Sequence, residues 1–314
     1  MTTRAAEATG WSAALVLALG LGVVLTGAVA PERARPAPVA APVAEQAETP
    51  VARDLVAVER PFDEGVIDPD LGPPPGPFPD RVPTRRAAPQ DRYALLVGVQ
   101  DYRSPTKDTI GSRADVELIR TALLDAGWLP QNVRVLTDAG ATGDALREGM
   151  DWLAARSVPG TFALFHYSGH VKQLGGGTEA LWPVDRDFVR DSDVTARLAR
   201  STGKLWVDVA GCEAGSFLPG LPSDRVLVSA SSTATEKSYE YPEWGTSVWT
   251  GLLFRQAPGE ADADGDGQVV VGEALRFSRY YAQLITKLQE PYGRQTPQVE
   301  GDPVRGWTLD SPPA

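Results

Sequence analysis

Apolar residues along the chain form two kinds of pattern, continuous runs and runs with helical spacing. Continuous apolar runs of strand length occur at 93–99, 133–136, 161–167, 204–209 and 225–229. Helical spacing predicts helices at 114–126, 143–155, 247–255 and 273–288. Strands that are apolar throughout and alternate with helices are typical of a mostly parallel sheet with helices on both faces. We therefore expect one α/β domain over residues 91–314.

Residues 11–30 differ from these runs because they contain no charged side chain over twenty positions. As a helix rising 1.5 Å per residue, they would span a hydrocarbon core of about 30 Å. They predict a single-pass transmembrane anchor after a short tail at 1–10. A cleaved signal peptide is the alternative, which Pro31 disfavours because it directly follows the small residues of 28–30. We expect the folded domain outside the cytoplasm, although the flanking basic residues leave the orientation open.

Residues 31–90 separate this segment from the expected domain and contain 14 of the 27 prolines in the chain. The stretch lacks the apolar periodicity that would offset its ordering entropy. It is predicted to be a disordered Pro- and Ala-rich linker with polyproline II character.

Charge and residue counts narrow the chemistry. The chain has 41 acidic against 30 basic residues, a net charge of −11, which disfavours nucleic acid as a partner. It contains one cysteine and two histidines, so it forms no intrachain disulfide and no multi-histidine metal centre. Cys212 is then either a buried small hydrophobe or a reactive thiol.

The reactive candidates follow two predicted strands. His170 comes after the run at 161–167, and Cys212 comes after the run at 204–209. The carboxyl ends of parallel strands meet at one edge of a sheet, so both side chains are expected at that edge. A thiol needs a base to ionise near neutral pH, and an imidazole is suited to that role. His166 lies within its strand and is interpreted as a core histidine.

The string His166-Tyr-Ser-Gly-His170, followed 42 residues later by Cys212, resembles the caspase-like cysteine peptidases, and most closely the metacaspases and their bacterial relatives. The resemblance extends over most of 91–314. Strings that contribute to it lie at 93–102 (YALLVGVQDY), 111–115 (GSRAD), 181–185 (LWPVD), 229–232 (SASS) and 295–297 (QTP). It implies a caspase-like three-layer α/β/α sandwich around the mostly parallel sheet.

The resemblance also implies roles for residues. Cys212 would be the nucleophile and His170 the general base and acid of an endopeptidase that acts on protein or peptide substrates without a cofactor. The main-chain N–H groups of Cys212 and Val171 would bind the oxyanion. Family members usually have glycine where Val171 stands. A catalytically inactive caspase-like scaffold or a calcium-binding adaptor is therefore the alternative.

Substrate preference is expected to follow from polar positions near the cysteine. Metacaspases place an aspartate two residues before the cysteine, and here Ala210 stands there. Asp208 has the same facing along an extended strand and would partly replace it. Asp115, Ser112 and Ser168 match further pocket positions of the family, although Asp115 could equally be an acid at a helix start. Cleavage after Arg or Lys is expected.

Residues 262–273 match the twelve-residue EF-hand loop, which holds Ca²⁺ through oxygen atoms. Its candidate ligands are Asp262, Asp264, Asp266, Gln268 and Glu273. The segment before the loop is predicted to be a poor entering helix, which indicates a half-hand, and an acidic helix cap without metal is the alternative. The acids Asp185, Asp191 and Asp193 form a second, weaker calcium candidate by resemblance to metacaspases. The sequence leaves the oligomeric state open.

Overall fold

The computed structural model describes residues 56–57, 70–77, 83–217, 220–221, 224–289, 291–301 and 306–309. The expected anchor at 11–30 and most of the expected linker lie outside these ranges. Among the described residues, no helix combines the length and apolarity needed to cross a membrane.

A six-stranded sheet forms the centre of the domain, in the order β12-β9-β8-β4-β2-β3. Its strands are β2 (Arg92–Gly98), β3 (Val133–Thr137), β4 (Phe162–Ser168), β8 (Lys204–Ala210), β9 (Val226–Ala230) and β12 (Gln298–Glu300). All neighbours pair in parallel except β12, which runs antiparallel to β9. β3 pairs with one edge of β2, and β4, the next long strand in the chain, pairs with the other edge. The carboxyl ends of β2 and β4 therefore border a topological switch point, where ligands bind in sheets of this kind.

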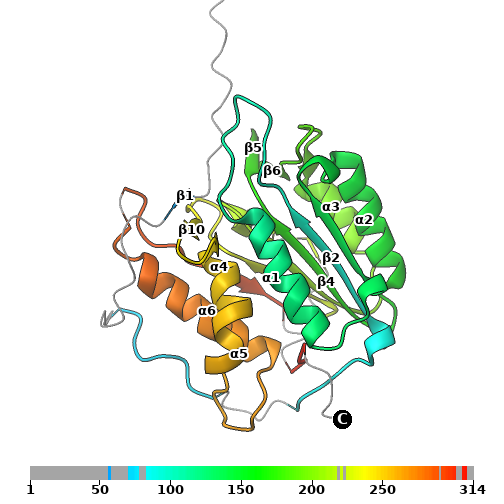
Figure 1. Ribbon diagram of the computed structural model, residues 1–314, viewed down its shortest axis with the longest axis vertical. Coiled ribbons are helices and arrows are strands. Elements are labelled where there is room, and N and C mark those ends of the chain that lie inside the picture. The colour runs from blue at the N-terminus through cyan, green and yellow to red at the C-terminus, as the bar shows by residue number, and fades with distance from the viewer. Residues whose placement is uncertain are drawn as a thin grey trace, which may run out of the picture. The chain divides into compact units, whose positions relative to one another are not determined.

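Helices cover both faces of this sheet (Figure 1). One face packs against α1 (Ser112–Asp125), α4 (Val248–Gly251) and α6 (Val271–Thr286), and the other against α2 (Gly143–Arg156) and α3 (Asp191–Leu198). Side chains alternate along each strand between two buried clusters, which explains the continuous apolar runs in the sequence. The expected α/β/α layers with a mostly parallel sheet are confirmed.

Gly98, the last residue of β2, lets α1 approach the sheet closely. A Cβ at this position would lie 2.5 Å from the carbonyl oxygen of Ser112 and 2.7 Å from Cγ2 of Val116. Any larger residue would push away the first turn of α1. The glycine therefore places the start of α1, with Ser112 and Asp115, beside the carboxyl ends of β2 and β4.

Short elements that the sequence did not predict surround this edge. They are two small sheets, β5 (Val171–Gly175) with β6 (Thr178–Leu181) and β7 (Val189–Arg190), and β1 (Val56–Ala57) with β10 (Tyr239–Tyr241) and β11 (Thr246–Ser247). Short 3-10 turns lie at η1 (Pro89–Asp91), η2 (Pro130–Asn132), η3 (Asp138–Gly140) and η4 (Ala214–Phe217).

The helix expected at 247–255 continues further, as α4, a π-helical turn η5 (Leu252–Gln256) and α5 (Ala257–Glu260). The prediction of a poor entering helix before the loop at 262–273 was therefore wrong. Pro258 explains both the prediction and the outcome, because its ring would clash with the carbonyl of residue 254 in a regular helix. The wider π turn directly before it relieves that clash and lets the helical path continue.

Contacts of the domain begin before residue 91. Arg85 pairs with Trp307 through a β-bridge, and Ala87 is buried in the cluster beneath α1. The Arg92 guanidinium, fully buried, donates to the carbonyl of Ala87 and to that of Leu309 near the other end of the described chain. Residues 85–90, placed in the linker from their composition, thus pack as part of the domain.

Candidate active site

The ends of β4 and β8 place His170 and Cys212 at the same level of the sheet. The two strands pair in register from Phe162 opposite Lys204 to Ser168 opposite Ala210, and each candidate residue lies two positions beyond the last pair. The turns that follow are in contact, because a Cβ on Gly211 would lie 2.8 Å from the carbonyl oxygen of Gly169. The structure therefore brings together the two turns that carry the thiol and the imidazole.

Serine hydroxyls hold the turn that carries Cys212. Ser231 Oγ bonds both to the N–H and to the carbonyl of Gly211, and Ser232 Oγ accepts from the N–H of Ala214 at 3.2 Å. Glu213, directly after the cysteine, has φ of 61°, which is unusual for a residue other than glycine. Backbone strain of this kind clusters at functional sites, where the surrounding structure maintains it.

The sulfur of Cys212 faces a backbone donor. The N–H of Ser238 points at Sγ over 3.3 Å, and the whole residue is 1% exposed. A hydrogen bond donated to sulfur stabilises the thiolate more than the thiol. The thiol in turn donates to the carbonyl of Ser238 at 3.8 Å, so residue 238 bonds to the sulfur through both of its main-chain polar groups.

The imidazole of His170 is oriented by a main-chain carbonyl. Its Nε2 lies 2.7 Å from the carbonyl oxygen of Lys107. A carbonyl oxygen only accepts hydrogen bonds, so Nε2 carries the proton in the neutral ring and Nδ1 is the basic atom. A general base needs such an oriented, unprotonated nitrogen.

The N–H of Val171 points away from the hairpin partner of its own strand. Val171 is opposite Leu181 in the β5–β6 pair, and the N–H of Trp182 donates to the carbonyl of His170 at 3.1 Å. That bond identifies the Val171–Leu181 pair as the kind that exchanges no hydrogen bonds across the strands. The Val171 N–H is therefore not used by β6, which is consistent with the expected oxyanion donor.

Asp115 and Ser168 meet beside this edge. Ser168 Oγ donates to Oδ2 of Asp115 over 2.7 Å, and the N–H of Ser247 donates to Oδ1 over 2.8 Å. Burial raises the pKa of the Asp115 carboxyl, while the nearby His166 and these two hydrogen bonds oppose that rise. Ser112 lies one turn earlier on α1 and accepts a hydrogen bond from Thr109 Oγ1. The expected pocket residues Asp115, Ser112 and Ser168 are thus adjacent and fully buried.

Asp208 belongs to the interior of the domain. Its Oδ2 lies 2.8 Å from Nδ1 of His166, and its Oδ1 accepts from Trp249 Nε1 at 2.9 Å and from Ser229 Oγ. All of these side chains are completely buried. The interpretation of His166 as a core histidine is confirmed. The carboxylate of Asp208 is fully engaged by internal partners, and its expected role in substrate binding stays a prediction.

The loop at 262–273 gathers three of its five candidate ligands. Carboxylate oxygens of Asp262, Asp264 and Glu273 lie within 4.8 Å of one another. Burial, together with the acids Asp262 and Asp264, raises the pKa of Glu273, although its oxygens accept from the N–H groups of Ala263 and Val270. Carboxylates crowded in this way have the donor set that Ca²⁺ prefers.

The other two candidate ligands of this loop have different partners. A carboxylate oxygen of Asp266 accepts from the N–H of Gln268 at 2.9 Å, and the side-chain oxygen of Gln268 accepts from Arg86. The structure does not group either side chain with the three acids. At the seventh position of an EF-hand loop the ligand is the backbone carbonyl, so Gln268 could still contribute that atom.

The acids of the second calcium candidate have other structural partners in the described chain. Asp185 accepts from the N–H of Gly143 at the start of α2, and Asp191 begins α3 and accepts from the N–H of Ser192. Together with Asp193 they are not among the described carboxylates that gather as a metal site.

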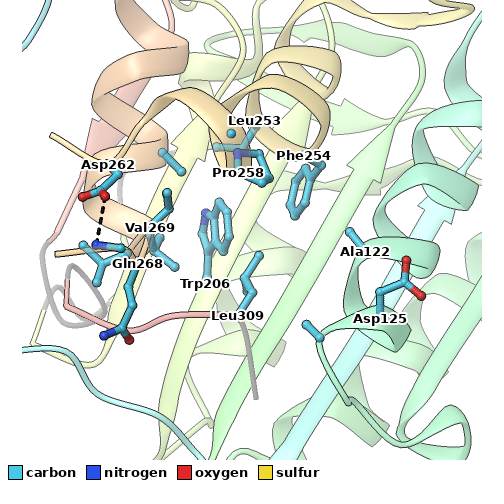
Figure 2. Close-up of a pocket in the computed structure, with 16 residues that line it drawn as sticks. Ala122, Asp125, Trp206, Leu253, Phe254, Pro258, Asp262, Gln268, Val269 and Leu309 are labelled. Carbon is cyan, nitrogen blue, oxygen red and sulfur yellow. Dashed lines mark hydrogen bonds between the residues drawn. The ribbon is translucent and has the colours of Figure 1, made fainter. Parts of the chain in front are cut away.

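A cavity of about 480 Å³ opens beside the calcium-type loop (Figure 2). Trp206 and Phe254 stack at its base with ring centroids 5.8 Å apart, and Asp262 lies on its wall. Neither Cys212 nor His170 lines this cavity, so it is separate from the candidate active site.

Some contacts of the site involve atoms that sequence reasoning did not identify. Lys107 acts through its carbonyl and Ser238 through its N–H, so the type of side chain gives no signal. Tyr102 and Trp182 enclose the imidazole, with ring centroids 4.4 and 6.0 Å from it. Tyr102 ends the string at 93–102 and Trp182 lies within 181–185, both noted only as parts of a resemblance.

Comparisons with known proteins agree with this arrangement. A crystal structure of a Geobacter sulfurreducens protein matches with a TM-score of 0.50 and 15% identity, over 68% of this chain and 94% of that one, which bears on the fold alone. A search of curated proteins found no match. The family model for the caspase domain of the C14 peptidases matches residues 91–264, more than half of the chain. The chain therefore belongs to the caspase-domain family of cysteine peptidases, whose substrates are proteins.

Proposed function

We propose that the protein is a cysteine endopeptidase in which Cys212 is the nucleophile and His170 is the general base and acid. The observation that carries the proposal is the parallel register of β4 and β8, which puts both residues two positions past paired strand ends. The Ser238 N–H at the sulfur and the Lys107 carbonyl at Nε2 support the same roles.

In the proposed reaction, Nδ1 of His170 takes the proton of the Cys212 thiol, and the thiolate attacks the peptide carbonyl carbon. The N–H groups of Cys212 and Val171 stabilise the resulting oxyanion. The tetrahedral intermediate collapses as the imidazolium gives its proton to the leaving amine. Water, deprotonated by the same imidazole, then hydrolyses the thioester and restores the thiol.

Cleavage after Arg or Lys is the proposed specificity, with the buried Asp115 as the carboxylate that a basic side chain would reach. Asp115 supplies a carboxylate beside the switch point of the sheet, and Ser168 and the Ser247 N–H stabilise its ionised form. A guanidinium or ammonium group would pair with this carboxylate and offset the cost of burying its charge.

A calcium-responsive loop at 262–273 is the second part of the proposal. Three acids converge there, and helical segments enter and leave the loop. Because α6 packs against the same sheet face as α1, which carries Asp115, metal binding would act on an element of the catalytic domain itself.

The third part of the proposal is that residues 11–30 hold the protein in a membrane as an uncleaved anchor, with the peptidase domain outside the cytoplasm. Its support is the uncharged twenty-residue run in the sequence. Calcium levels outside the cytoplasm would suit a loop of modest affinity.

The decisive test of the peptidase function replaces the nucleophile. With fluorogenic peptides, Cys212→Ala is expected to lower turnover by about four orders of magnitude or more, because no other thiol can replace it. Circular dichroism of both proteins checks that the fold is unchanged. Retained turnover in Cys212→Ala would refute the assignment. A wild-type protein that neither hydrolyses peptides nor reacts with an arginyl chloromethylketone would instead be an inactive scaffold.

A further inference from the structure

The segment between β2 and α1 contacts the imidazole of His170 through two of its residues. The ring of Tyr102 lies against the imidazole at 4.4 Å between centroids and 34° between planes, and Lys107 bonds to Nε2. The N–H of Tyr102 donates to Oδ1 of Asp108 over 2.7 Å. Since Asp108 directly follows Lys107, this bond ties the two contacts together.

Two tyrosine hydroxyls bind the main chain of His170. The N–H of His170 donates to Oη of Tyr102 over 2.8 Å, and Oη of Tyr167 donates to the carbonyl of His170, also over 2.8 Å. A hydrogen bond also joins the two hydroxyls, and Tyr102 is its donor when the proton of Tyr167 is used for the carbonyl of His170. The bonds run from the N–H of His170 through both hydroxyls back to its carbonyl, and the main chain of Trp182 also contacts Oη of Tyr167, through its N–H at 3.1 Å and its carbonyl at 3.2 Å.

The environment of the two tyrosines keeps both phenols protonated and tightly packed. Burial raises the pKa of Tyr102 well above its ordinary value, and burial also raises the pKa of Tyr167. Both phenols therefore remain donors across the physiological pH range. A Cβ on Gly169 would lie 2.6 Å from the hydroxyl of Tyr102 and 2.9 Å from that of Tyr167, so only glycine fits between the strand and His170.

We infer that Tyr102 is a positioning residue for the reaction, acting with Tyr167 to fix the backbone and ring of His170. The ring then presents Nε2–H to Lys107 and leaves Nδ1 as the base. This inference rests on the proposed function, because it names the group that orients the proposed base. Tyr102 acts through His170 and would not itself touch the substrate.

The test measures the imidazole directly as well as the kinetics. The chain has only two histidines, so long-range ¹H–¹⁵N spectra of the full-length protein contain two imidazole patterns. Tyr102→Phe keeps the ring against His170 and removes the hydroxyl. Tyr93→Phe is the matched control, because Tyr93 lies in β2 just before this segment and its ring packs against Trp152 instead of His170.

In the wild type and in Tyr93→Phe, His170 is expected to hold its proton on Nε2 alone. In Tyr102→Phe a mixture of tautomers is expected, with kcat lower by about tenfold or more and KM within about twofold. Identical tautomers, pH titration and kcat in Tyr102→Phe and wild type would overturn the inference. If Tyr102→Phe does not fold, Tyr167→Phe breaks the same chain of bonds and is held to the same criteria.

The two proposals can fail separately. A wild type without peptidase activity, in which Tyr102→Phe still changes the tautomer of His170, refutes the peptidase function and leaves the positioning of the imidazole supported. If the wild type is active and Tyr102→Phe changes neither the tautomer of His170 nor kcat, only the positioning role is refuted.

Discussion

At the scale of single residues, Asp115 combines a cost in stability with a proposed role in recognition. Its carboxyl is completely buried and has hydrogen bonds but no cationic side chain bonded to it in the described chain. Burial raises its pKa, so the folded protein binds this proton more tightly than the unfolded chain does. Stability therefore falls as the pH rises from the ordinary aspartate range through the raised pKa.

Asp115→Asn is expected to remove that loss of stability. The free energy of unfolding of the variant should fall less between pH 4 and pH 8 than that of the wild type, as measured by urea unfolding. The exposed Asp144→Asn is the control. The same Asp115→Asn variant should lose at least about tenfold in kcat/KM on arginyl peptides, because a carboxylate partner is removed. An unchanged preference for Arg would exclude Asp115 from the substrate pocket.

At the scale of elements, the sequence predicted the long strands and helices well, because residues such as Leu164 and Val207 lie in continuous apolar runs. It missed β5 to β7 and α3, since these short elements lie outside the central sheet and most side chains of β5 and α3 are at least partly exposed, so they form no apolar run. In the site, Cys212 and His170 could be found from residue type and spacing. Lys107 and Ser238 could not, because they contribute only main-chain atoms.

The loop between α5 and α6 carries the calcium prediction. Adding CaCl₂ is expected to raise the melting temperature of the wild type, because a ligand at about 100 times its Kd stabilises the folded state by about 2.7 kcal/mol. Glu273→Gln should abolish most of this increase. Glu260→Gln, an exposed acid just before the loop, should not. Peptidase rates recorded over the same titration show whether calcium also changes activity. An equal increase in both variants would argue against a site at 262–273.

At the scale of the whole molecule, the caspase-family domain begins before residue 91, with Arg85 and Ala87 already in contact with it. Composition alone assigned those residues to the linker, because prolines flank them. They nevertheless pack in the domain, because Arg85 pairs with Trp307, which is distant in sequence, and the carbonyl of Ala87 accepts from the buried Arg92 guanidinium.

The proposed anchor makes a separate prediction for the full chain. Expressed in bacteria, the complete protein should sediment with membranes and resist extraction by carbonate. Deletion of residues 11–30 should release it to the soluble fraction with kcat/KM unchanged on small peptides. If the gene for the whole sequence instead yields a protein that begins at residue 31, the segment is a cleaved signal peptide.

The buried bond between His166 and Asp208 has a consequence for the alignment of the two reactive side chains. A slip of one residue between β4 and β8 would move Cys212 by about 3.3 Å relative to His170. The same slip would turn Asp208 to the other face of the sheet, away from His166, Ser229 and Trp249. A carboxylate would then be buried without partners, at a cost of several kcal/mol. Misaligned strands are thus penalised in the interior of the domain, independently of any substrate.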